Sequence, residues 1–134
     1  MMRLIISIFL IGFLTSCTLP EHYRDIEILH RERSDFILTL STVPARPHVG
    51  KNLFRATLTD PAGRPITDAA VTFSYRMSHM LLMHNVEKAR MSQPGIYEAE
   101  TDFNMGGDWD VTVEIERPGR KIVREEFVIS AGTM

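Results

Sequence analysis

The chain has one cysteine, no excess of basic residues and no hydrophobic run long enough to span a membrane comfortably. Because Cys17 is the only cysteine, an internal disulfide is excluded. The formal net charge of −2 provides no basic face, so we expect no nucleic-acid partner. The longest apolar run, Leu4 to Leu14, has about eleven residues, whereas a membrane-spanning helix needs about twenty.

Motifs that carry catalysis are also missing. There is no phosphate-binding glycine loop, no His-Glu-x-x-His segment and no Gly-x-Ser-x-Gly elbow. Four carboxylates share one parity of a predicted strand: Asp108, Asp110, Glu114 and Glu116. This pattern is typical of a solvated sheet face rather than of an acid–base pair. We therefore predict that the protein is not an enzyme.

The first 16 residues are typical of a secretion signal. Arg3 supplies a positive charge, the apolar run 4–14 follows, and Leu14-Thr15-Ser16-Cys17 resembles the lipobox of bacterial lipoproteins. We predict a signal peptide over 1–16, a lipid on Cys17 and a place in the cell envelope, facing the periplasm or exterior. Since Thr18 is not aspartate, the outer membrane is favoured in a Gram-negative cell. The alternatives are an ordinary secretion signal and an uncleaved anchor.

Residues 17–34 are charged and lack a clean hydrophobic period, which predicts a lipidated tether with a short helical turn around 25–32. From Asp35 onwards the pattern changes to short runs in which apolar and polar residues alternate. Such runs predict half-buried strands near 36–40, 54–58, 71–77, 97–103, 109–116 and 122–129, and a further strand is expected at about 86–91. The last run breaks its alternation, which predicts a bulge or an edge strand. Trp109 is expected to anchor the core.

Turn residues separate these runs. Asp60 to Pro65, Ser92 to Gly95 and Pro118-Gly119 are strong turn signals, and no run suits a helix of ten residues. The fold class is therefore all-β, an antiparallel β-sandwich of about seven strands over residues 35–134.

Methionine and histidine cluster in the middle of the chain. The cluster consists of Met77, His79, Met80, Met83 and His84, with Met105 downstream. Thioethers select Cu(I) among the available metals, and they can replace thiolates in an oxidising compartment. If strands alternate in direction, the 78–85 and 104–107 loops lie at one end of the sandwich, so Met105 approaches the cluster. The alternative is structural: Met77 shares the parity of core residues, and Leu81 and Leu82 bury the other methionines.

With these segments in place, the domain resembles the YtkA-like family, which is related to FixH-type periplasmic domains. The resemblance covers about residues 44–116. It rests on an ordered set of segments: Gly50 to Asn52, Asp60 to Val71, Met77 to Met83, Gly95 to Tyr97 and Met105 to Trp109.

The resemblance implies an immunoglobulin-like sandwich outside the cytoplasmic membrane, and it associates the chain with copper handling or oxidase maturation. The ligands that it implies are Met77, His79, Met80, Met83 and Met105. Two functions follow. One is a membrane-anchored module that binds Cu(I); the other is a metal-free module that contacts another envelope protein.

Overall fold

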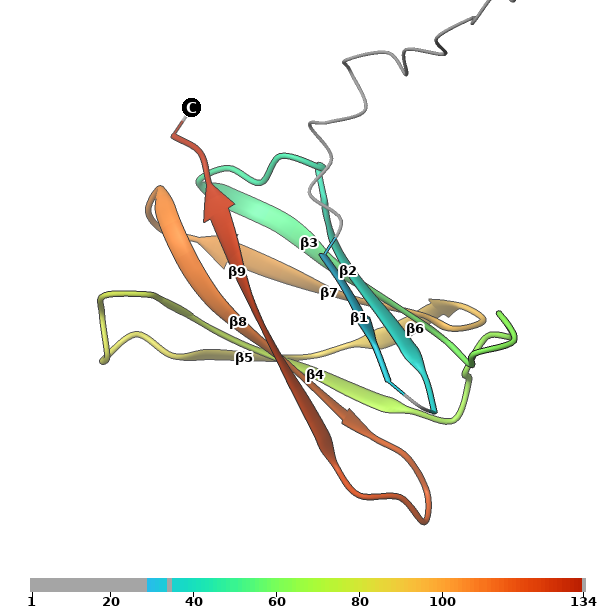
Figure 1. The fold of residues 1–134 in the computed structure, drawn as a ribbon. Helices are drawn as coiled ribbons and strands as arrows, with labels where there is room; N and C mark the ends of the chain where they lie inside the picture. Colours follow the sequence, from blue (N-terminus) through green and yellow to red (C-terminus); the bar gives the residue numbers. More distant parts are fainter. Residues whose placement is uncertain (1–28, 34, 134) are drawn as a thin grey trace, which may run out of the picture.

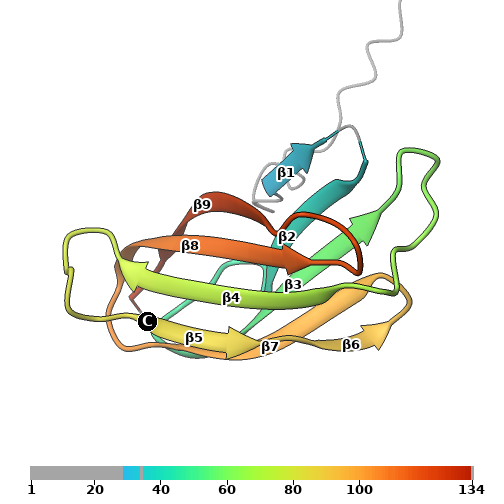
Figure 2. The ribbon, with the colours of Figure 1, turned by 90° about the horizontal axis from the view of Figure 1, so that it is seen from below.

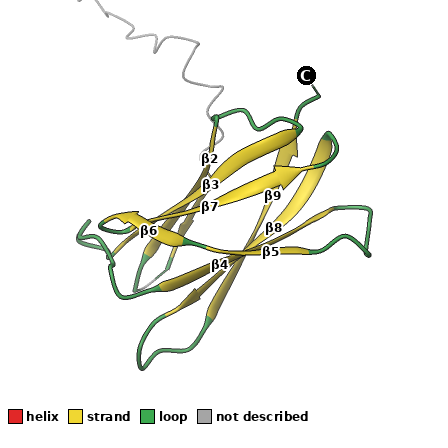
Figure 3. Ribbon diagram, turned by 180° about the vertical axis from the view of Figure 1, so that it is seen from behind, coloured by secondary structure: helices red, strands yellow, loops and turns green. Residues whose placement is uncertain are grey.

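The computed structural model describes residues 29–33 and 35–133. The predicted signal peptide, Cys17 and most of the predicted tether lie outside these residues. The described part contains strands and loops and no helix, so it holds no helix that could cross a membrane (Figure 3). Nine strands form in chain order: β1 (Leu29–Glu32), β2 (Ile37–Val43), β3 (Gly50–Thr59), β4 (Ala70–Met77), β5 (Asn85–Lys88), β6 (Arg90–Gln93), β7 (Ile96–Phe103), β8 (Gly107–Glu116) and β9 (Val123–Ala131).

The strands form two antiparallel sheets that pack face to face (Figure 1). One sheet has the order β1-β2-β3-β7-β6 and the other the order β5-β4-β8-β9. Each inner face is built from alternate residues, so the period-2 patterns of the sequence become the burial pattern of the strands. The predicted all-β sandwich is confirmed. The buried core residues that the structure describes lie between Phe36 and Ala131, and Leu29 of β1 packs against them.

Five aromatic rings pack against one another in this core: Phe54, Phe73, Tyr75, Phe103 and Trp109. Trp109 is fully buried, as predicted, and its ring centroid lies 5.0 Å from that of Phe103 and 6.0 Å from that of Tyr75. Phe54 continues the cluster, with its ring centroid 5.8 Å from that of Phe103. Such tilted and edge-on ring contacts stabilise the core beyond the apolar area that they bury.

The two sides of the sandwich are closed in different ways. On one side, β5 pairs with β4 in one sheet and β6 pairs with β7 in the other. The chain changes from one sheet to the other at Ala89, which lies between β5 and β6 (Figure 2). On the other side, β1 lies against β9: Arg33 forms an ion pair with Glu125, and the Arg31 guanidinium lies 5.2 Å from the Phe127 ring centroid. The two sheets are thereby joined by the chain on one side and by side-chain contacts between β1 and β9 on the other.

Two sequence expectations need correction in detail. The described part of the predicted tether is not a helical turn, because residues 29–32 form β1 along the edge of β2. The number of strands is nine rather than about seven, because β1 is added and the segment between β4 and β7 divides at the sheet switch. The last strand, β9, is an edge strand as predicted, with continuous register against β8.

Candidate functional site

Three loops meet at one end of the sandwich, which we call the methionine end: residues 44–49, 78–84 and 104–106. β4 ends and β8 begins there, with Met77 opposite Trp109, and the Ser78 N–H donates to the Asp108 carbonyl at 3.0 Å. Gly50 at the start of β3 lies opposite Phe103 at the end of β7, which brings the other two loops to the same end. The predicted meeting of the 78–85 and 104–107 loops is confirmed.

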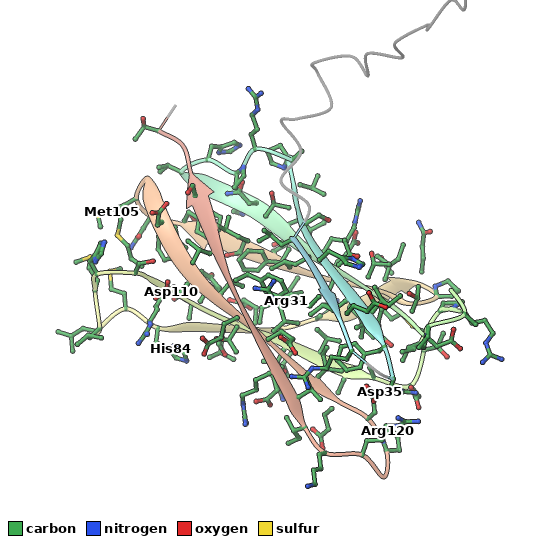
Figure 4. The ribbon with its side chains drawn as sticks, viewed as in Figure 1. Arg31, Asp35, His84, Met105, Asp110 and Arg120 are labelled. Carbon is green, nitrogen blue, oxygen red and sulfur yellow. The ribbon has the colours of Figure 1, made fainter. Side chains whose placement is uncertain are left out.

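The 78–84 and 104–106 loops also contact each other through side chains. The Asn104 amide donates to the Met83 sulfur at an Nδ2–Sδ distance of 3.8 Å. In the same turn, the Trp109 indole N–H donates to the Met105 carbonyl at 3.2 Å. The buried Trp109 ring therefore fixes the backbone of the turn that carries Met105 (Figure 4), and Asn104 of the same turn contacts Met83 on the neighbouring loop.

The methionines differ in their exposure. The side chains of Met80 and Met105 are accessible, at 41% and 39% exposed, and Met83 is half-buried. Met77 packs against the core, and its Cε would lie 2.9 Å from a Cβ added at Gly107, whose φ is +128°. The positive φ favours glycine at 107, and the Met77 methyl group fills the space that a Cβ would take. Met80, Met83 and Met105 are the thioethers that solvent or a ligand can approach.

The two loop histidines lie in different surroundings. His79 is exposed within the 78–84 loop. His84 lines a groove of about 390 Å³ on the outer face of the β4–β8 sheet, together with Arg76 and Asp110. Figure 4 shows His84 and Met105 apart, with His84 at the start of β5 and Met105 beside the turn before β8. Of these two imidazoles, His79 is the one that does not line the groove and stands next to Met80 in the chain.

Among residues 29–33 and 35–133, no group of three or more His, Cys, Asp and Glu side chains is placed to hold a metal. The carboxylates of β8 have surface partners. Asp110 accepts from the Ser78 hydroxyl at 2.7 Å and lies 3.6 Å from Arg76, and Glu114 pairs with Arg124 at 2.7 Å. These contacts fit the solvated sheet face that the sequence predicts.

Three features of this end were not foreseen from the sequence. Leu81 and Leu82 do not bury the neighbouring methionines, since they are 80% and 99% exposed. Asn104 contributes the contact between the loops, and nothing in its sequence neighbourhood marks it. Asn52 is buried and organises the 44–49 loop: its amide donates to the carbonyls of His48 and Gly50, and its oxygen accepts from the His48 N–H.

Solved structures share the fold at low sequence identity. A DUF4426 family protein from Pseudomonas aeruginosa is 14% identical, with a TM-score of 0.56 over 77% of this chain and 93% of that one. The PmoD soluble domain from Methylocystis sp. is 14% identical, with a TM-score of 0.54 over 79% and 98% of the two chains. These likenesses support the fold alone.

At the sequence level, comparison with curated proteins gives no match. The sequence model described as YtkA-like matches residues 32–114, which is more than half of the chain and includes every strand from β2 to β7. The match also includes all three loops of the methionine end. The resemblance seen in the sequence is thereby confirmed, and the chain belongs to the YtkA-like family.

Proposed function

We propose that this protein is an extracytoplasmic lipoprotein, anchored through Cys17, that binds Cu(I) at the methionine end. The lipobox-like segment 14–17 supports the anchor, because lipidation accounts for a single cysteine in an exported chain. The membrane is then one partner, and an envelope protein that delivers or accepts the metal is the other. The role is binding rather than catalysis.

The observation that carries the copper proposal is the contact between Met83 and Asn104. It brings two loops, some twenty residues apart in the chain, within side-chain reach of each other. Around this contact Met80 and Met105 have accessible side chains, and no carboxylate lies in either loop. Thioethers are soft ligands, which prefer Cu(I) over the harder divalent ions that carboxylates attract. The donors that are present therefore fit Cu(I) rather than Zn²⁺ or Ca²⁺.

The residues that would hold the metal are Met80, Met83 and Met105, with His79 as the imidazole. A Cu(I) ion bound by three of these four residues keeps an open position, through which an acceptor's ligand can attack during transfer. Met77 is assigned to packing, since it fills the space beside Gly107. His84 is assigned to the groove on the outer face of the sheet.

A competition titration with a chromophoric Cu(I) chelator tests the proposal. Residues 18–134 are the right material, because they keep the whole sandwich and lack the Cys17 thiol, which would compete for copper. We expect one Cu(I) per chain, and a loss of affinity of about tenfold or more in Met80→Leu and in Met83→Leu, which preserve side-chain volume. Met91→Leu is the matched control, because Met91 is exposed on β6, away from the methionine end.

Binding weaker than micromolar, or equal losses in all three variants, would contradict the copper proposal. The protein would then be the metal-free interaction module, with the same fold and anchor. The anchor has its own test, since mass spectrometry of the protein made in a bacterial cell should find a lipid-modified Cys17 at the N terminus. An unmodified thiol there would refute the anchor and leave the copper proposal untouched.

A further inference from the structure

The tip of the loop between β4 and β5 carries two leucines that contact almost nothing. Leu81 is 80% exposed and Leu82 is 99% exposed, and the adjacent Met80 is 41% exposed. Single exposed apolar residues are ordinary, but three in succession at a loop tip, with Met105 on the next loop, form an apolar surface of the kind that marks an interaction site. Because the copper proposal uses the thioethers and not the leucines, this surface needs its own explanation.

The two ends of the sandwich differ in charge. The loops of the methionine end, residues 44–49, 78–84 and 104–106, contain no aspartate or glutamate. The opposite end carries charges of both signs in its two long connections, 60–69 and 117–122. There Asp68 pairs with Arg117 at 3.0 Å and Arg120 pairs with Asp35 at 3.1 Å. The nearest carboxylates belong to the flanking strand ends, where Asp108 follows Gly107 on β8 and Asp102 precedes Phe103 on β7. The loops themselves carry no anionic side chain that would be repelled by anionic lipid headgroups.

The register of β1 shows from which end the chain enters the sandwich. Leu29 lies opposite Leu40, while Glu32 lies opposite Ile37, so β1 begins on the side where β2 ends, and β2 ends at the methionine end (Figure 1). Eleven residues, 18–28, separate Leu29 from Cys17. At about 3.3–3.6 Å per residue, these cannot reach farther than about 40 Å.

We propose that the methionine end rests on the lipid bilayer, with Leu81 and Leu82 inserted at the boundary between headgroups and acyl chains. This inference rests on the proposed anchor at Cys17, which keeps the domain within reach of the membrane and raises the effective concentration of the loop at its surface. The leucines supply apolar burial, and the 78–84 loop that carries them has no carboxylate to desolvate. Met80 and Met83 then lie at the membrane surface, where a membrane-embedded acceptor could receive the metal.

Fluorescence quenching in vesicles tests this placement. Residues 17–134 are coupled through the Cys17 thiol to a maleimide-headgroup phospholipid in phosphatidylcholine vesicles, with or without bromine on the acyl chains. Leu82→Trp reports on the loop tip. Ala62→Trp is the matched control, because Ala62 is exposed in the turn at the opposite end. Trp109 is buried and contributes the same background in both chains.

We expect brominated lipid to reduce the added emission of Leu82→Trp about twofold or more and to leave that of Ala62→Trp nearly unchanged. Adding Leu81→Ser to the reporter chain should lower the inserted-to-free ratio about tenfold, because a buried leucine side chain is lost. Equal quenching at both positions, or quenching at neither, would overturn the proposal and leave the leucines for a protein partner. Chemical coupling replaces biological lipidation and no copper is present, so failure here is distinct from failure of the anchor or of copper binding.

Discussion

Replacing Asn52 by alanine should destabilise the domain by removing the bonds that shape the 44–49 loop. Asn52 is 5% exposed, and its side chain makes three hydrogen bonds: to the His48 carbonyl at 2.7 Å, to the Gly50 carbonyl at 2.8 Å and from the His48 N–H at 3.1 Å. Each contributes about 1 kcal/mol net, so the expected loss is about 3 kcal/mol. Total stabilities of about 5–15 kcal/mol make this loss large.

Urea unfolding of residues 18–134 measures the loss directly. Trp109 is the only tryptophan and is fully buried, so its fluorescence reports the unfolding of the sandwich. Asn104→Ala is the control: Asn104 is exposed and makes one weak contact to sulfur, so it should cost less than about 0.5 kcal/mol. A loss below about 1 kcal/mol in Asn52→Ala would show that the loop keeps its shape without the side chain, and the reasoning would be wrong.

Three further changes have defined outcomes. Tyr97→Phe removes a hydroxyl that donates to the Ile66 carbonyl at 2.9 Å and accepts from the Ala69 N–H at 3.3 Å. Thermal unfolding should record a loss of about 1–2 kcal/mol in the free energy of unfolding, and an unchanged free energy would contradict the buried hydrogen bond. Leu82→Ser should leave the free energy of unfolding within about 0.5 kcal/mol, because the side chain is 99% exposed; a larger loss would mean that the loop packs on the core. The hydrogen bond from Arg55 lowers the pKa of Glu98 below its ordinary 4.5, so this carboxylate stabilises the fold above that pH and stops doing so as pH falls through its folded pKa. Unfolding measured from pH 6 to pH 3 should therefore decline less steeply in Glu98→Gln, and parallel curves would refute the assignment.

Local alternation was enough to predict the sandwich. Along β8 the side chains of Trp109, Val111, Val113 and Ile115 are all buried, because a period of two places them on one face of the sheet. The direction of successive strands also predicted that the 78–85 and 104–107 loops share an end. The chain reverses after β4, before β7 and after β7, while β5 and β6 run in the same direction through the sheet switch at Ala89. These properties depend on neighbours in the sequence, which explains why they could be derived.

Features that depend on tertiary packing could not be derived in this way. Leu81 and Leu82 have the composition of core residues, and only the position of the β4–β5 loop beyond the sheets leaves them exposed. Residues 29–32 carry no alternating pattern that would predict a strand. β1 forms instead by pairing with β2, and Arg31 and Arg33 attach it to β9. Likewise, the Asn104 amide reaches the Met83 sulfur only because the fold brings their two loops together.

Copper binding is tested most directly by the methionine methyl groups themselves. In residues 18–134 labelled with ¹³C at the methionine methyls, each methionine gives its own resonance while Cu(I) is added. The account predicts that the resonances of Met80, Met83 and Met105 shift together and saturate at one equivalent of Cu(I), while that of Met91 on β6 stays in place. Resonances that do not move, or that move as much for Met91 as for the loop methionines, would contradict a copper site at this end of the sandwich.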